Sequence, residues 1–336
     1  MIGSAALAGA TLLAIQGCAP GSSAAAGASS GHGPSYAQAM AQARSAYQNY
    51  VGVSTAAAAS GDKAQALGVV AYTQWAQVKG QYTTLASAGT PVSQYRYGTP
   101  HYDLPDPAGY LQWFMVTVPR STEAGGRLGP VVATIMVFGR AKANLPWTLD
   151  GTVPLNQPLP KLAYQSDGYA VTRPATDAGV LLSPDVVGPT QAAVADEGPG
   201  HPAAAVISAG PQTTGLYAAQ AAQGRAERAR GLVYQWLLQG APFPQFQLRL
   251  RSGGDLVLYG MYLNTSVEHP GLAKGSPIAV PAGFSPLFAA PTEVGYHAVF
   301  ANWTYQFAAI DPPATAHHAK VAVIAANGAP SYGHAY

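Results

Sequence analysis

The chain has 336 residues, of which 48% are hydrophobic and only 10% are charged, and its formal net charge is +2. This length and apolar content are enough to bury the cores of two domains of ordinary size. The charges are balanced and form no Lys- or Arg-rich run, which disfavours a nucleic-acid-binding protein. A single cysteine excludes an internal disulfide bond and a zinc site built on several thiolates.

The first 17 residues have the features of a lipoprotein signal peptide. Residues 2–15 are uncharged and mostly apolar, but they are too few to span a bilayer, which takes about 20 residues. The only cysteine follows in Ile15-Gln16-Gly17-Cys18, which resembles a lipobox. We expect cleavage between Gly17 and Cys18 and a diacylglyceryl group on the Cys18 thiol. The lipid would anchor the mature chain at the extracytoplasmic face of the cell membrane.

One feature leaves an alternative open. The basic segment that usually begins a signal peptide is missing before Ile2, as it would be if translation began further upstream. The alternative is a conventional signal peptide followed by an incidental, buried cysteine. Residues 18–34 contain no large apolar side chain and are rich in Ala, Gly and Ser, so we expect a flexible tether that leads to the folded part.

The folded part is predicted to begin with helices and to continue with strands. Apolar residues recur at three- and four-residue spacing between 35 and 88, with a break at Ser60-Gly61-Asp62. Runs typical of strands follow at 111–118, 131–138 and 146–153. In the first run, alternation assigns two opposite faces, which are Gln112, Phe114 and Val116 against Trp113, Met115 and Thr117.

A second block repeats this order after a connector at 155–184, which has a turn at Ser166-Asp167-Gly168. A short helix is expected from Ser183 towards Asp196, and a longer one over 216–238. The strands expected after these helices lie at 246–251, 256–267, 297–310 and 320–325. The first two flank a Gly-Gly-Asp turn and predict a β-hairpin.

Helices followed by antiparallel strands, found twice, predict an α+β fold with two domains. In each domain the N-terminal helices would pack on an antiparallel sheet. We place domain one at 35–160, the connector at 161–184 and domain two at 185–336. The same order of elements occurs in cone-shaped folds similar to nuclear transport factor 2, which is a likeness of fold alone.

Three motifs accompany the lipobox and the tether. They are residues 97–105 (YGTPHYDLP) with 109–114 (GYLQWF), residues 159–160 (LP) with 166–170 (SDGYA), and residues 305–313 (YQFAAIDPP). Together they resemble a family of actinobacterial envelope lipoproteins that share a domain of unknown function. The resemblance covers most of the chain after the tether. It implies location at the membrane and an organisation in two parts. It implies no chemistry, because the family has no assigned activity.

The densest mixture of aromatic and polar side chains supplies the candidate binding residues, which are Tyr97, His101, Tyr102, Asp103, Tyr110 and Trp113. One interpretation is an aromatic-lined cleft for a glycan or peptide, with a carboxylate to orient it. Another is a loop packed by its own tyrosines. In a third, His101 and Asp103 form a general-base pair, for which the sequence identifies no nucleophile.

Other polar groups are better explained as solvated surface. Asp196, Glu197 and His201 could ligate a hard metal ion, but they lie in a Gly- and Pro-rich loop that gives them little support. The pair His317-His318 fits an exposed turn. The cations of the longer helix, Arg225, Arg228 and Arg230, fit a solvated helix face, or else a contact with lipid headgroups or an anionic wall polymer. We expect neither a metal nor a cofactor.

No P-loop and no H-E-x-x-H motif is present. We therefore expect a non-catalytic envelope lipoprotein that binds a ligand or a partner, such as an envelope protein or a glycan, and no nucleic acid. Two alternatives stay open. One is a hydrolase or isomerase with a cleft near His101 and Asp103, and the other is a structural or assembly factor of an envelope complex.

Overall fold

The computed structural model describes residues 35–106, 111–124, 126–270, 278–281, 283–288 and 297–335. The predicted signal peptide, Gly17, Cys18 and the tether lie outside the described residues. The break predicted at residues 60–62 is confirmed, but the helical stretch after it is itself divided, so three helices come first. They are α1 (Tyr36–Ser60), α2 (Lys63–Leu67) and α3 (Tyr72–Ser87).

Local signals set the ends of these helices. Ser35 accepts a hydrogen bond from the Gln38 N–H, and the Gln38 side chain bonds back to the Ser35 N–H, which completes a capping box at the start of α1. Gly61 then adopts a left-handed conformation with φ of 72° and ends α1. The Asp62 carboxylate caps α2 by accepting from the Gln65 N–H.

The first sheet follows these helices in the chain and is antiparallel throughout. Its main path is β1-β3-β5-β6, and β2 and β4 also pair with β3. Its strands are β1 (Gln94–Tyr97), β2 (His101–Asp103), β3 (Gln112–Ala124), β4 (Arg127–Leu128), β5 (Val132–Arg140) and β6 (Thr148–Pro154).

The second half repeats the order of helices and then strands. Its helices are α4 (Pro184–Glu197), the 3-10 turn η1 (Pro202–Ala205) and α5 (Thr214–Ala229). Its sheet, also antiparallel, has the order β11-β10-β9-β7, with β8 paired to β9. The strands are β7 (Val233–Gly240), β8 (Phe246–Arg249), β9 (Asp255–Glu268), β10 (Ala298–Asp311) and β11 (Ala322–Ala335), and the turn η3 (Ser285–Leu287) precedes β10.

The helix predicted over 216–238 is wrong in its second part. The structure ends α5 at Ala229, and Gly231 adopts a left-handed φ of 76°. The following residues form β7, in which Val233 pairs with Glu268 of β9. The β-branched and aromatic side chains after Gly231 favour a strand, and pairing with β9 outweighs the helical spacing. The hairpin predicted at 246–267 is confirmed as β8 and β9.

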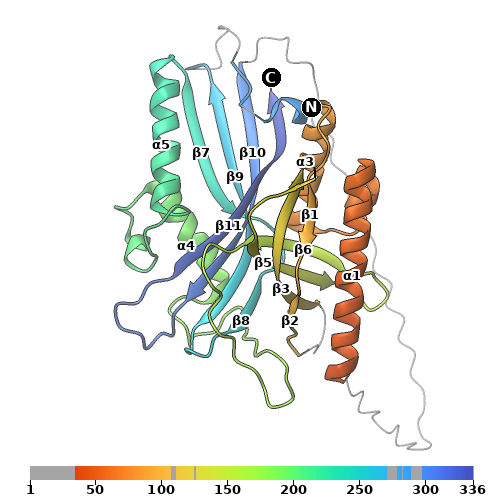
Figure 1. Cartoon of the computed structure of the whole chain (residues 1–336). Coiled ribbons are helices and arrows are strands. Elements are labelled where there is room, and N and C mark those ends of the chain that lie inside the picture. Colours follow the sequence, from red (N-terminus) through yellow and green to blue (C-terminus); the bar gives the residue numbers. More distant parts are fainter. Residues whose placement is uncertain are drawn as a thin grey trace, which may run out of the picture. The chain divides into compact units, whose positions relative to one another are not determined.

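The two sheets enclose a shared apolar core. Met115 and Ile135 of the first sheet belong to one buried cluster with Leu248 and Leu256 of the second sheet. On the opposite faces, α1 covers the first sheet, and α4 and α5 cover the second (Figure 1). The alternation predicted for β3 is confirmed, since Phe114 and Val116 pack towards α1 while Trp113 and Met115 pack into the shared core. The α+β class with two antiparallel sheets is therefore confirmed.

Helix α3 joins the two halves. The Gln77 amide donates to the carbonyl oxygens of Thr304 and Asn327, both at 2.9 Å, and the Asn327 amide donates to the Thr152 carbonyl at 2.9 Å. A Cβ atom added at Gly80 would lie 2.2 Å from the Pro330 carbonyl oxygen, so glycine permits the close approach of α3 to β11. Helix α3 thus lies at the junction of both sheets.

Candidate functional site

The predicted pair of His101 and Asp103 is brought together on β2. The His101 Nε2 atom lies 3.1 Å from Asp103 Oδ1, and the Tyr164 hydroxyl donates to the same oxygen at 2.5 Å. The His101 side chain is 71% exposed, whereas that of Asp103 is 1% exposed. Burial raises the pKa of Asp103, and the contacts with Tyr164 and His101 lower it in part. Tyr164 comes from the connector, and no pattern in the sequence predicted its position here.

The other predicted residues divide between the two faces of the first sheet. Tyr97 and Tyr102 pack edge-on against Tyr47 of α1, with ring centroids 6.3 and 6.0 Å apart. Trp113 lies on the opposite face and packs against Phe246 of β8, with ring centroids 5.0 Å apart. Tyr110 lies outside the described residues. The structure therefore joins His101 to Asp103 and separates Trp113 from Tyr97 and Tyr102.

The remaining predicted groups are surface or structural contacts. Asp196 accepts two hydrogen bonds from the Leu238 N–H, at 2.9 and 3.1 Å, while Glu197 lies 3.7 Å from His201. Burial raises the pKa of Asp196 to about 6. No group of three or more His, Cys, Asp or Glu side chains suited to a metal ion occurs among the described residues. The pair His317-His318 and the three arginines of 225–230 are exposed, as predicted.

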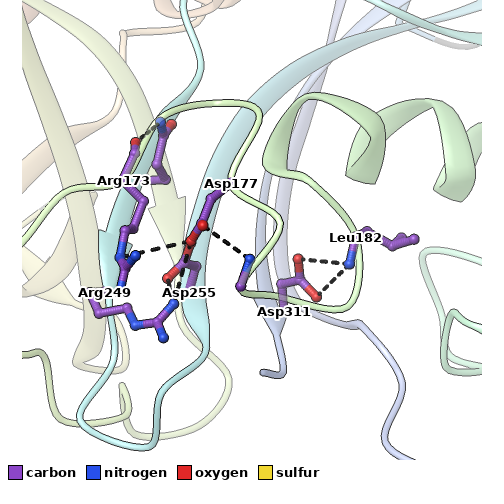
Figure 2. Close-up of polar contacts among 8 residues, drawn as sticks. Arg173, Asp177, Leu182, Arg249, Asp255 and Asp311 are labelled. Carbon is purple, nitrogen blue, oxygen red and sulfur yellow. Dashed lines mark hydrogen bonds and ion pairs between the residues drawn. The ribbon is translucent and has the colours of Figure 1, made fainter. Parts of the chain in front are cut away.

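A group of buried charges lies where the connector meets the second sheet (Figure 2). Arg249 Nη1 lies 3.2 Å from Asp255 Oδ1 and 3.6 Å from Asp177 Oδ2. The Asp255 side chain is completely buried and that of Arg249 is 16% exposed. Nearby, the Asp311 carboxylate accepts from the Leu182 N–H at 3.3 Å. These contacts fasten the connector to the sheet, and we regard them as structural.

A cavity of about 430 Å³, which we call the α1–α3 cavity, lies beside α3. It lies among the three helices, strands β1 and β3, and the last part of β11. The residues with polar or aromatic side chains that line it are Tyr50, Ser54, Thr55, Gln74, Gln77, Gln81, Tyr82, Thr84, Ser93, Gln94, Tyr95, Tyr97, Arg120, Thr152 and Asn327. Exposed Thr55 lies among them, so the cavity reaches the surface beside α1. Its volume is in the range that suits a single small molecule.

Arg120 is the only charged residue among the described residues that line this cavity. Its guanidinium lies over the Tyr95 ring, 4.2 Å from the centroid, and it also contacts the Tyr97 hydroxyl. No ion pair to a carboxylate forms at Arg120 among the residues that the structure describes. Burial raises the pKa of both Tyr50 and Tyr97, so these phenols stay neutral and can donate hydrogen bonds.

The lining glutamines divide into bound and free amides. Gln77 is held by Thr304 and Asn327, and Gln74 accepts from Gln306 at 3.2 Å. The amides of Gln81 and Gln94 make no hydrogen bond within the described part of the chain, so they are available to a ligand.

Sequence reasoning missed this cavity, although one signal was present. Gln74, Gln77 and Gln81 are spaced by three and four residues, which places three amides on one face of a helix. Arg120 and Tyr50 gave no such signal, because they meet only after β3 and α1 have packed together.

The comparisons with known proteins identify the family. None of the described helices is both long and apolar enough to cross a bilayer. Neither the curated proteins nor the solved structures gave a match to the chain. Residues 34–329 match the family model described as a domain of unknown function (DUF8094). This match spans most of the sequence, and the chain therefore belongs to the DUF8094 family.

Proposed function

We propose that this protein is a lipid-anchored protein of the cell envelope that binds a small ligand in the α1–α3 cavity without transforming it. The single observation that carries the binding role is the cavity of about 430 Å³, lined by tyrosines, free amides and one arginine. The lining residues that the structure describes include no carboxylate, imidazole or thiol, so none of the usual general bases is among them.

The test is recovery of a bound molecule from the full chain purified from the envelope of its native host. The Ala58→Trp variant fills the cavity from α1, and Thr84→Trp fills it independently from α3. Exposed Ala59 does not line the cavity, so Ala59→Trp is the matched control. We expect native mass spectrometry to show a small molecule on the wild type and the control, and neither cavity-filling variant to retain it.

Two results would contradict the proposal. One is a wild-type chain that carries no small molecule after gentle purification. The other is equal retention by both folded cavity-filling variants, with circular dichroism and the unfolding midpoint reporting that they are folded.

The envelope address rests on the sequence around Cys18. A diacylglyceryl group, with a further acyl chain on the freed amine, would give stable anchoring, whereas one chain binds only reversibly. The Cys18→Ser variant should leave the membrane fraction or accumulate as the uncleaved precursor. Unchanged fractionation together with an unmodified wild-type mass would rule out the anchor.

We also propose that the two halves are related domains, each with helices on a cone-like sheet. The repeated order of helices and antiparallel strands supports this view. A solved structure of a second family member tests this relationship. If the two halves are related domains, they should superpose on one another with the same order of strands.

The enzyme alternative has one specific observation in its favour. The His101 imidazole lies 3.1 Å from the buried carboxylate of Asp103, an arrangement that orients a general base. If His101→Ala and Asp103→Ala both restore every phenotype of a deletion strain, this alternative is excluded. Loss of function in both folded variants, with the cavity-filling variants active, would favour it over ligand binding.

A further inference from the structure

No carboxylate of the described residues neutralises the charge of Arg120 in the cavity. Within the same pair of strands, Arg96 Nε lies 2.5 Å from Glu123 Oε2 and is fully paired. Arg120, in contrast, has the ring of Tyr95 and the hydroxyl of Tyr97 as its contacts in this part of the chain. An arginine presents up to five N–H donors in a planar fork, and a ring face and one hydroxyl leave most of them unused.

The groups beside Arg120 favour an anion over a neutral molecule. The hydroxyls of Tyr50 and Tyr97 interact with each other and both lie near the guanidinium. The Tyr50 hydroxyl donates to that of Tyr97, so the Tyr97 hydroxyl and the guanidinium are the donors left for an oxyanion. Two oxygens of a carboxylate or phosphate match the fork of an arginine. No acidic side chain among the described lining residues would repel such a group.

The other lining residues indicate the chemical character of the remainder of the ligand. Val70, Val78 and Leu85 supply an apolar wall, and the free amides of Gln81 and Gln94 supply hydrogen bonds. These surfaces fit an uncharged body that is partly apolar and carries a few polar groups.

We propose that the cavity binds a small organic molecule with one oxyanion group, a carboxylate or a phosphate, and that Arg120 anchors this group. The inference rests on the proposed ligand-binding function. Tyr95 holds the guanidinium by stacking, and the Tyr97 hydroxyl, which accepts from Tyr50, completes the set of donors. The uncharged body of the ligand lies towards α3.

The first test uses simple oxyanions as probes. The thermal unfolding midpoint of the full chain is measured in acetate and in inorganic phosphate, with sodium chloride at equal ionic strength as the reference. We expect a saturable rise of the midpoint in at least one of the two oxyanions. The Arg120→Gln variant should lose the rise, and Arg96→Gln, which removes a paired arginine outside the cavity, should keep it.

The second test follows the molecule that copurifies with the wild type. Arg120→Gln should weaken its retention by at least about tenfold, because a hydrogen bond to a charged group is lost. The inference is overturned if Arg120→Gln retains the molecule as the wild type does, or if oxyanions act no differently from chloride. If Arg120→Gln retains the molecule but the cavity-filling variants lose it, the proposed ligand-binding function stands. Only the inference that the ligand carries an oxyanion group is then wrong.

Discussion

Arg249 and Arg120 are both partly buried arginines, and their surroundings are opposite. Arg249 lies between two carboxylates, 3.2 Å from Asp255 and 3.6 Å from Asp177, in the network of Figure 2. Arg120 has a tyrosine ring and a hydroxyl as neighbours and borders the α1–α3 cavity of about 430 Å³. The difference distinguishes an arginine with a structural role from one that binds a ligand. The charge of the first is paired with carboxylates of the protein, and the charge of the second is available to a ligand.

Removing the structural arginine should have the largest effect. Arg249→Met leaves the completely buried Asp255 carboxylate without its cation. We expect the free energy of unfolding to fall by about 3–5 kcal/mol, the usual cost of breaking a buried ion pair from one side. Denaturant unfolding measures it, with exposed Arg251→Met as the control on the same segment. A loss below about 1 kcal/mol would show that the network does not hold the connector.

Asp150 is a buried acid that has no cation among the described residues, unlike Asp255. Asp150 of β6 is 2% exposed, one of its oxygens has no hydrogen-bond partner, and burial raises its pKa from 3.8 to about 7. An acid with a raised pKa in the folded state binds a proton that the unfolded chain has released. Its contribution to stability is therefore present below about pH 4 and is lost as the pH rises towards 7.

The matching measurement is the difference in unfolding free energy between the wild type and Asp150→Asn across that pH range. One pKa unit corresponds to about 1.4 kcal/mol, so we expect the wild type to lose up to a few kcal/mol relative to the variant as the pH rises. Exposed Asp106→Asn is the control and should follow the wild type. Parallel curves for all three proteins would show that Asp150 ionises normally.

Removing the binding arginine should have the smallest effect on stability. Arg120→Met removes one cation–π contact and one hydrogen bond and leaves no carboxylate unpaired. We expect the unfolding free energy of the ligand-free protein to change by less than about 1 kcal/mol. A loss as large as that of Arg249→Met would mean that Arg120 has a structural role, and the two arginines would then not differ in function.

Local patterns predicted the elements better than the site. The β8–β9 hairpin follows from clean alternation around a Gly-Gly-Asp turn, and the faces of β3 follow from alternation within one strand. The helix predicted to 238 failed because spacing alone could not show that residues 233–240 pair with β9. Such pairing depends on residues about 30 positions away.

The candidate site depends on still longer contacts. Tyr50 and Arg120 are 70 positions apart, and Asn327 reaches the cavity from the far end of the chain. Nearness in sequence instead favoured the segment from Tyr97 to Trp113, whose aromatic rings lie on opposite faces of a sheet. Only the alternation of β2, which puts His101 and Asp103 on one side, made part of that group predictable.

A crystal structure of the full chain, purified from its native envelope without refolding, would show whether the cavity holds a ligand. We expect electron density for an organic molecule in the α1–α3 cavity, with an acidic group within hydrogen-bond distance of the Arg120 guanidinium. A cavity that holds only water, or one closed by movement of α3 onto β1, would contradict it.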